Sequence, residues 1–249
     1  MIPKKIHFCW FSDGEYPDGE YPSRIQKCLA SWKKFLPEYE VVCWTTKNFD
    51  FTKNIFALEA LNAKKWAFVS DYVRLSVLYE YGGIYLDSDV EIVKPFDEDL
   101  LTNTAFLGLE SEGVITSWLI GSEAKNPLIK EFLEYYKDRH FCINNRYDTT
   151  PNTVPLSKIC KKHGLTNENI IQDLGLVKVY PEEYFCAKSV IDGKIRITPN
   201  TYTIHHFDGG WQSPQDRFIK KMKYLVFSII GSSMYPRIRS IYRKIRDRS

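Results

Sequence analysis

The 249-residue sequence lacks the features that direct a chain into a membrane or an oxidising compartment. No run of residues reaches the ~18 apolar positions that a membrane-spanning helix needs. The 6 cysteines are scattered, with no C-x-x-C pair and no dense disulfide framework. The first residues lead almost directly into a short apolar run, without the long apolar core of a signal peptide. We therefore expect reduced cysteines and a cytoplasmic location.

Charge is distributed unevenly along the chain. Residues 217–249 hold 10 of the 34 Lys and Arg residues and only Asp247 in opposition, a net +9 that leaves −6 for the residues before them. Apolar positions there recur at helical spacing, as in helices that lie on a membrane with their cations toward lipid phosphates. The sequence predicts a basic amphipathic tail over 216–249, bound peripherally to the inner face of the plasma membrane. A tail helix packed on the body, with a solvated basic end, is the open alternative.

Strand-like and helix-like segments alternate in the first part of the chain. A buried strand is expected over residues 6–11, a helix over 23–36 and a second strand over 40–44. This spacing is typical of a parallel βαβ unit, in which ligands gather beyond the carboxyl ends of the strands. The chain length suits one α/β domain over 1–215, with a Rossmann-like mixed sheet flanked by helices. Further helices are expected over 63–81, 127–139 and 154–163, and further strands over 105–110, 114–120, 175–180, 194–197 and 202–206.

Two aspartates follow a glycine break near the end of the first third of the sequence. Asp87 and Asp89 come after an apolar strand, and if that strand continues they share one face with Tyr85. Two carboxylates aimed together repel each other, and a hard divalent cation relieves the repulsion while keeping coordination positions open for phosphate oxygens. The sequence therefore predicts a site for a metal-bound diphosphate. A solvated strand end, with the aspartates capping a turn, is the alternative.

Polar residues elsewhere in the chain are candidates for the same pocket. Asp71 and Arg74 lie on one stripe of the helix that feeds into the Asp87 strand, although an ordinary surface ion pair would give the same spacing. His205 and His206 follow a late strand, where adjacent side chains point opposite ways, so at most one is expected to reach the metal. Imidazole completes a Mn²⁺ shell readily and a Mg²⁺ shell less so. Ordinary packing remains the alternative for both histidines and for Trp211.

The order of these motifs resembles that of the family 32 glycosyltransferases. These are DXD-motif sugar transferases of GT-A fold from bacterial capsule and O-antigen loci, similar to yeast mannosyltransferases and to the glucosylating domain of large clostridial toxins. The likeness covers roughly residues 1–211. It is carried, in order, by residues 6–10, Ser31-Trp32, Tyr39-Glu40, 70–74, 82–89, His206 and Trp211.

The resemblance implies a donor-binding role for four residues. Trp10 would stack on the nucleotide base. Asp71 and Arg74 would grip the donor sugar and its diphosphate, and Tyr85 would be their neighbour. Asp71 and Arg74 are therefore also catalytic candidates.

The resemblance also implies a metal group made of Asp87, Asp89 and His206. Asp89 would bind the cation directly, while Asp87 would contact ribose, sugar or a metal-bound water. His206 would be the late metal ligand, and Trp211 would bind phosphate through its indole N–H. Bacterial relatives usually have serine before that tryptophan, and Gly210 stands there in this chain.

The activity that the resemblance implies is metal-dependent transfer of a sugar with retention of anomeric configuration. The donor would be a nucleotide sugar, UDP-linked, with Mn²⁺ or Mg²⁺ as cofactor, and nucleic acid is not an expected partner. The acceptor would be a growing surface polysaccharide repeat on a lipid carrier. No carboxylate is assigned as a covalent nucleophile, since Glu110, Asn152 and Asp173 are candidates by polarity alone.

Two other functions stay open at this point. In haloacid-dehalogenase-like phosphatases the first Asp of a D-x-D is the nucleophile, but the motif sits at the first strand and Thr or Val stands where this chain has Glu91. A protein of the glycosyltransferase fold that binds glycan or lipid without catalysis is the other alternative. Loss of turnover in Asp89→Asn would separate an enzyme from such a binder.

Overall fold

The computed structural model describes residues 1–12, 21–189 and 192–208. The chain divides into two compact units, the first made of Met1–Ala187 and Ile197–His206 and the second of Lys188–Arg196 and Phe207–Ser249. All the elements and the site described below belong to the first unit. Trp211 and the tail expected over 216–249 lie outside the described residues. Among the described residues, no helix is both long enough and apolar enough to cross a membrane.

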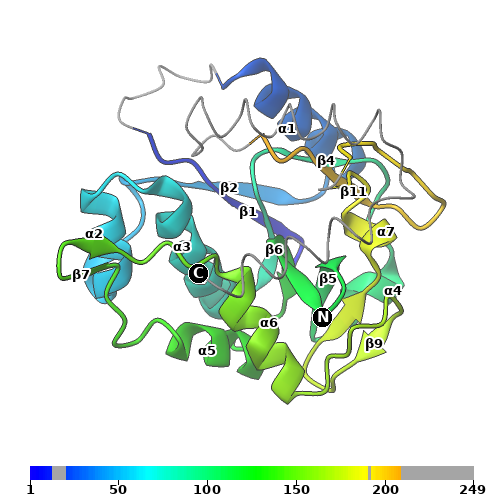
Figure 1. Cartoon of the computed structure of the whole chain (residues 1–249). Helices are drawn as coiled ribbons and strands as arrows, with labels where there is room; N and C mark the ends of the chain where they lie inside the picture. The colour runs from blue at the N-terminus through cyan, green and yellow to red at the C-terminus, as the bar shows by residue number, and fades with distance from the viewer. Residues whose placement is uncertain (13–20, 190–191, 209–249) are drawn as a thin grey trace. The chain divides into compact units, whose positions relative to one another are not determined.

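A seven-stranded mixed sheet forms the centre of the first unit (Figure 1). Its first three strands in sheet order are parallel, and β6 then runs antiparallel to both of its neighbours. β10 is parallel to β5, and β9 closes the edge in the antiparallel direction. The strands are, in sheet order, β2 (Glu40–Trp44), β1 (Lys5–Cys9), β3 (Gly83–Leu86), β6 (Val114–Ser122), β5 (Ala105–Ser111), β10 (Lys178–Tyr180) and β9 (Gln172–Asp173).

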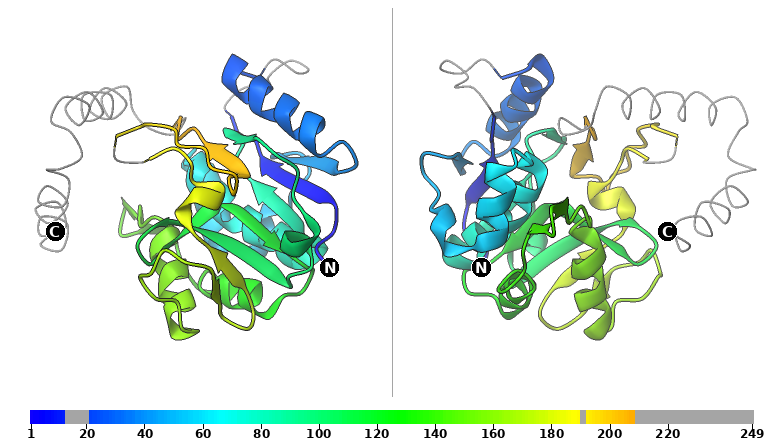
Figure 2. Two further views of the ribbon diagram at one scale, coloured as in Figure 1. Left: turned by 90° about the vertical axis from the view of Figure 1, so that its right-hand side faces the viewer. Right: turned by 60° about the vertical axis from the view of Figure 1, so that its left-hand side comes forward.

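Helices and a short strand pair cover the two faces of this sheet (Figure 2). On one face lie α3 (Trp66–Tyr81), α5 (Pro127–Glu134) and α6 (Thr153–Lys162), with α2 (Ile55–Asn62) packed against α3. The other face carries α1, α7 and a ribbon in which β4 pairs antiparallel with β11. The remaining bounds are α1 (Ser23–Phe35), α7 (Glu182–Phe185), β4 (Val90–Ile92), β11 (Thr203–His205), the 3₁₀ turn η1 (Phe51–Lys53), α4 (Glu98–Leu101), β7 (Cys142–Ile143) and β8 (Arg146–Tyr147).

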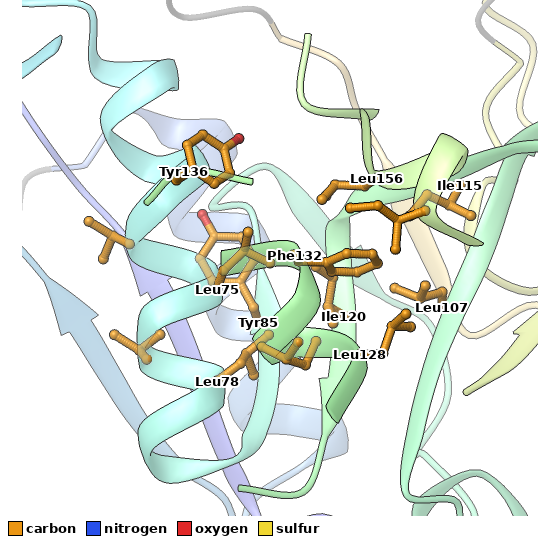
Figure 3. Packing of buried hydrophobic residues seen from close by; sticks show 14 of the residues in the cluster. Leu75, Leu78, Tyr85, Leu107, Ile115, Ile120, Leu128, Phe132, Tyr136 and Leu156 are labelled. Atoms are coloured by element: carbon orange, nitrogen blue, oxygen red, sulfur yellow. The ribbon is translucent and has the colours of Figure 1, made fainter. Parts of the chain in front are cut away.

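The main core lies between the sheet and helices α3, α5 and α6 (Figure 3). Leu107 and Ile120 project from the sheet into this core, where Leu75 and Phe132 meet them from the helices. Phe106, next to Leu107, points to the opposite face and stacks on Phe185 of α7 with the ring centroids 5.6 Å apart. Because both faces are covered, the central strands are apolar on both sides, which explains their nearly continuous hydrophobic sequences.

The structure confirms the predicted α/β class, with a mixed sheet flanked by helices. The strand expected over 194–197 is wrong, since this segment has only an isolated bridge between Lys188 and Ile195. The helix expected over 127–139 ends at Glu134. Sequence patterns also missed α2, whose apolar residues occupy most positions and form no distinct stripe, and they missed the β4 strand and the β7–β8 hairpin, which are too short for a periodic signal.

Candidate functional site

The site lies at the carboxyl ends of β1 and β3, which run parallel and side by side. α3 passes into β3 through Gly82 and Gly83, whose φ angles of 63° and 106° fall in the region that favours glycine. A Cβ on Gly83 would lie 2.6 Å from the carbonyl oxygen of Lys5, so only glycine lets β3 approach β1 this closely. The helix that carries Asp71 is thereby joined directly to the strand that ends at the D-x-D.

Asp87 and Asp89 lie in a turn between β3 and β4, so the expectation that the strand continues through them is wrong. The turn is closed by the Val90 amide, which donates to the Asp87 carbonyl over 3.0 Å. The Asp87 amide donates to the carbonyl of Trp118 on β6 over 2.9 Å, which fixes the start of the turn to the sheet. The Tyr85 hydroxyl donates to Asp87 Oδ1 over 2.9 Å, so these two side chains do share a face.

The turn brings both carboxylates together with one histidine. One ligand atom from each of Asp87, Asp89 and His205 lies within 4.8 Å of the other two. Oxygen and nitrogen ligands at about 2.0–2.6 Å from one cation lie up to about 5 Å apart, so this spacing fits a single ion. Two carboxylates and an imidazole suit Mn²⁺ better than Mg²⁺, which prefers oxygen ligands. Asp87 keeps 29% of its side chain exposed, which leaves room for a further ligand.

The histidine in this group is His205, whereas the sequence predicted His206. Val90 pairs with His205 in the β4–β11 ribbon, which turns the imidazole toward Asp89, with 3.2 Å between Nε2 and Oδ1. The next side chain along the strand points the other way. His206 Nε2 lies 2.8 Å from Glu91 Oε2, and its Nδ1 lies 3.2 Å from Arg24 Nη1. His206 therefore bridges β4 and α1 and does not face the aspartates.

Trp118 is a site residue that sequence reasoning missed. Its ring lies against the imidazole of His205, with centroids 4.5 Å apart and planes inclined by 33°. Its carbonyl also accepts the Asp87 amide. The tryptophan thus fixes one carboxylate and the histidine of the same cluster. Nothing in its local pattern distinguishes it from any apolar residue of a buried strand.

Arg74 is buried and contacts the carboxylates of both Asp71 and Asp87. Its Nε donates to the carbonyl of Ser70 over 3.1 Å, and its Nη1 donates to the carbonyl of Ser117 over 2.6 Å. Nη2 lies 3.1 Å from Asp71 Oδ1 and 3.4 Å from Asp87 Oδ1. Asp71 and Arg74 are only 8% and 4% exposed, so the surface ion-pair alternative is wrong. Since every guanidinium nitrogen already has a protein partner, Arg74 acts by holding both carboxylates in place.

Burial and these neighbouring charges also shift the pKa values of Asp71 and Arg74. The pKa of Asp71 is raised to about 7, chiefly by burial; Arg74 opposes the shift and Asp87 adds to it. Burial alone would lower the pKa of Arg74, but Asp87, Tyr85 and Asp71 raise it well above the usual range. Arg74 thus remains a cation.

The structure distinguishes between the three polar candidates that the sequence left open, Glu110, Asp173 and Asn152. Glu110 on β5 is close enough to His205 for their charges to interact, and burial raises the pKa of Glu110 while His205 lowers it. Asp173 is exposed on β9 at the far edge of the sheet. Asn152 is buried immediately before α6. Of these three, only Glu110 has a described interaction with a member of the aspartate–histidine cluster.

Trp10, the candidate for stacking on the nucleotide base, lies at the carboxyl end of β1. It follows β1 at the same sheet edge as Asp87, and its amide donates to the carbonyl of Trp44 over 2.9 Å. Its half-buried ring meets the ring of Tyr21 edge-on, with centroids 5.0 Å apart. The other predicted aromatic, Trp211, is outside the described residues.

Comparison with known proteins shows which sequences this chain resembles. Residues 22–107, which include α1, Asp71, Arg74 and the D-x-D, match the family model described as "Glycosyltransferase sugar-binding region containing DXD motif". The chain is 27% identical over 169 residues to inositol phosphoceramide mannosyltransferase 1 of Schizosaccharomyces pombe, covering 63% of this chain and 48% of that protein. It is 28% identical over 158 residues to an uncharacterised glycosyltransferase of Acanthamoeba polyphaga mimivirus, covering 61% of each.

Among solved structures, the PaToxG glycosyltransferase is similar over 66% of this chain and 69% of that one, with 20% identity and a TM-score of 0.48. The matched part of the chain spans less than two thirds of the curated relatives named above. The family model and the curated relatives show that part of the chain is similar to DXD-type glycosyltransferases. They leave the donor, the acceptor and the cellular role to be inferred.

Proposed function

We propose that this chain is a metal-dependent retaining glycosyltransferase that moves a sugar from a nucleotide sugar to a glycan acceptor. The observation that carries this proposal is the convergence of Asp87, Asp89 and His205 beside the buried Asp71–Arg74 pair. A metal-binding group next to a buried, hydroxyl-binding carboxyl is what a sugar diphosphate requires, since one part neutralises the phosphates and the other orients the sugar.

Each residue of the site has a distinct task in this proposal. Asp87, Asp89 and His205 hold Mn²⁺, which when bound neutralises the charge that develops on the leaving diphosphate. Asp71 accepts hydrogen bonds from donor-sugar hydroxyls, and Arg74 keeps Asp71 and Asp87 oriented. Trp10 provides a ring for the nucleotide base, as the resemblance to family 32 enzymes implies.

Retention of configuration requires the acceptor hydroxyl to approach the face from which the diphosphate leaves. A leaving phosphate oxygen can take the acceptor's proton, so no protein base is required. The donor we propose is UDP-linked, and Trp211 completes the phosphate site in this proposal. Of the two carboxyls that the sequence left open, Glu110 and Asp173, Glu110 is the one whose charge interacts with His205.

The acceptor we propose is a surface polysaccharide repeat of capsule or O-antigen type, carried on a lipid. Support comes from the resemblance to capsule and O-antigen enzymes and from the mannosyltransferase relative, whose name includes a phosphoceramide. The basic tail over 216–249 would then hold the enzyme peripherally on the cytoplasmic face of the membrane. Flotation of full-length and Arg217-truncated protein with anionic liposomes tests this location, and equal flotation of both would refute it.

A thermal-shift screen of nucleotide sugars tests the donor and the metal together. A ligand that binds only the folded protein raises its apparent melting temperature. We expect UDP-sugars to stabilise the protein with Mn²⁺ and much less without it. Stabilisation by GDP-sugars alone would show that the donor carries guanine and not uracil. Stabilisation by no nucleotide sugar, with or without Mn²⁺, would favour a glycan- or lipid-binding protein of the same fold.

The phosphatase alternative has little support. The D-x-D follows the third strand of the chain rather than the first. Asp87 Oδ1 already accepts from Tyr85 and lies beside Arg74, so it is not a free nucleophile. Labelling of Asp87 by a ³²P phosphate donor would restore this alternative.

A further inference from the structure

The β7–β8 hairpin stands out as an exposed, well-supported feature that the donor site does not use. Ile143 and Arg146 pair next to a two-residue turn whose residues, Asn144 and Asn145, have φ angles of 50° and 61°. Positive φ at both positions is the signature of a type I′ turn, which matches the twist of a tight hairpin. Ile143 and Tyr147 are 54% and 48% exposed, so the hairpin offers apolar surface to solvent.

The ring of Tyr147 packs against a buried aromatic residue. It stacks on Phe141, with centroids 5.2 Å apart and planes inclined by 15°. Phe141 is fully buried and packs edge-on against Phe56. The carboxylate of Glu59 accepts from the backbone amides of Phe141 and Cys142, over 2.8 and 3.0 Å. The hairpin is thus tied to α2, and the tyrosine ring is a supported platform rather than a loose side chain.

The platform packs against α3, the helix that carries Asp71. Phe68 lies on α3 three residues before Asp71, and its ring contacts Phe141 with centroids 5.1 Å apart. Residues three apart on a helix share a face, so the hairpin packs along the stripe of α3 that leads to Asp71. Burial raises the pKa of Tyr135, and Asp148 and Asp71 both raise it further, which puts hairpin and pocket within electrostatic reach of one side chain.

The surface around the ring has the chemistry of a sugar site. An open hollow of about 480 Å³ is lined by Ile143, Asn144, Arg146, Tyr147 and Asp148. Aromatic rings bind the C–H faces of sugars, while amide, guanidinium and carboxylate groups bind the hydroxyls around the ring. The Lys65 ammonium lies 5.6 Å from the Tyr147 ring centre, on an exposed and flexible chain that can move to meet a hydroxyl.

We propose that the β7–β8 hairpin binds a pyranose unit of the acceptor glycan, stacked on Tyr147. The inference rests on the proposed function, in which Asp71 binds the donor sugar, so that a site on the same stripe of α3 as Asp71 is where the acceptor approaches. A lipid surface is the competing occupant of exposed apolar residues. The hairpin tip argues against it, because the residues that would enter the membrane first are two asparagines.

Saturation-transfer NMR with methyl pyranosides tests this proposal without knowledge of the natural acceptor. The probes are the methyl α-pyranosides of mannose, glucose, galactose and N-acetylglucosamine. The proteins are the full chain, Tyr147→Ala, Tyr147→Trp and the control Tyr81→Ala, which removes a comparably exposed tyrosine at the far end of α3. We expect transfer to at least one pyranoside in the full chain, the Tyr147→Trp variant and the control. Tyr147→Ala should reduce it about fivefold or more.

The control measurements separate this inference from the proposed function. Tyr147→Ala should keep its melting temperature shift with nucleotide sugar and Mn²⁺, which shows that the donor site is intact. Absence of transfer to every pyranoside, or equal transfer in Tyr147→Ala, would overturn the hairpin site while leaving the donor site standing. Binding of the full chain to phosphatidylglycerol vesicles that Tyr147→Ala abolishes would also overturn it, in favour of a lipid surface.

Discussion

At the scale of single residues, the two adjacent histidines have different surroundings. His205 lies with Asp87 and Asp89, packed under Trp118, whereas His206 bonds to Glu91 and to Arg24 of α1. The sequence correctly indicated that only one could reach the aspartates, because adjacent strand residues point apart. It could not indicate which, since that depends on the register of β11 against β4.

This difference predicts how Mn²⁺ affinity responds to substitution. His205→Ala removes a proposed ligand and should weaken Mn²⁺ binding by at least about 100-fold. His206→Ala removes a residue that only braces the ribbon and should weaken it by about tenfold or less. Titration of free Mn²⁺ by electron paramagnetic resonance measures both affinities. A larger loss for His206→Ala than for His205→Ala would contradict the arrangement.

His7 has no expected contact with substrate, yet it should control the acid stability of the fold. It is fully buried, its Nε2 lies 2.9 Å from the Gly82 carbonyl, and its Nδ1 accepts from Trp44 over 3.1 Å. The pKa of His7 is lowered from 6.5 to about 4, chiefly by burial and also by Lys5, while the Gly82 carbonyl and Glu40 oppose the shift. The folded state therefore favours the neutral ring, and its stabilising effect is lost as pH falls through 6.5 toward 4.

Between pH 7 and pH 5 we expect His7 to lower the free energy of unfolding by about 2 kcal/mol. Urea denaturation of the full chain and His7→Gln at both pH values measures this contribution. The variant should be less stable at pH 7 but lose less stability on acidification. His163→Gln, which removes a histidine paired with Glu131 on the surface, should retain the loss due to His7. An unchanged pH dependence in His7→Gln would contradict the assignment.

At the scale of elements, α1 borders the turn that carries Asp87 and Asp89. Trp32 Nε1 donates to the Val90 carbonyl over 2.7 Å, and Ser31 Oγ accepts from the Ile92 amide over 2.9 Å. β4 therefore has β11 on one edge and two α1 side chains on the other. The Ser-Trp pair entered the sequence argument only through the family resemblance. Its task of satisfying a strand edge becomes visible only when the helix is placed beside β4.

Trp32→Phe should loosen this border. The change keeps an aromatic ring but leaves the buried Val90 carbonyl without its donor and a small cavity beside it, which costs about 2–4 kcal/mol of stability. Because Val90 adjoins Asp89, Mn²⁺ affinity should fall as well. Chemical denaturation and a Mn²⁺ titration measure the two effects. Unchanged Mn²⁺ affinity in a measurably destabilised variant would show that α1 stabilises the fold but has no effect on the metal site.

Glycine marks the closest approaches between elements. Gly121 on β6 lies under the Phe106 ring, and a Cβ there would be 2.0 Å from the nearest ring carbon. Gly121→Ala should therefore destabilise the protein by about 1–3 kcal/mol, because the ring must leave its stack on Phe185. Thermal unfolding measures the loss. Gly164→Ala is not a suitable control, because the φ of 101° there is itself costly for alanine. Ala124→Gly is a better control, because it adds no side-chain atom to the protein. A melting temperature of Gly121→Ala equal to that of the unaltered chain would contradict the packing.

At the scale of the whole molecule, the sequence predicted the class of fold and most of the long elements. α3, β2 and the β5–β6 pair have strong periodicity or apolar runs, and their bounds agree with the structure to within a few residues. Elements of two to four residues, such as β4 and β7, carry no period and exist only because a neighbour pairs with them. The sheet order is likewise a consequence of long-range pairing, which local patterns do not encode.

The candidate site shows the same division. Asp71, Arg74 and Asp87 were identified because a helix, a glycine break and a strand follow one another in the sequence. Ser117 and Trp118 were missed because they come from a later strand that reaches the site only through the antiparallel pairing of β6 with β3. Residues that act by holding others have no chemical signature of their own in a sequence.

The central claim is that Asp89 helps to hold the metal on which donor cleavage depends. The most direct measurement is Mn²⁺ affinity together with hydrolysis of a nucleotide sugar, in the full chain and in Asp89→Asn, which keeps the size of the side chain. We expect the substitution to weaken Mn²⁺ binding severely and to remove most turnover, a loss of several kcal/mol of transition-state stabilisation. Unchanged Mn²⁺ affinity with unchanged turnover in Asp89→Asn would contradict the account.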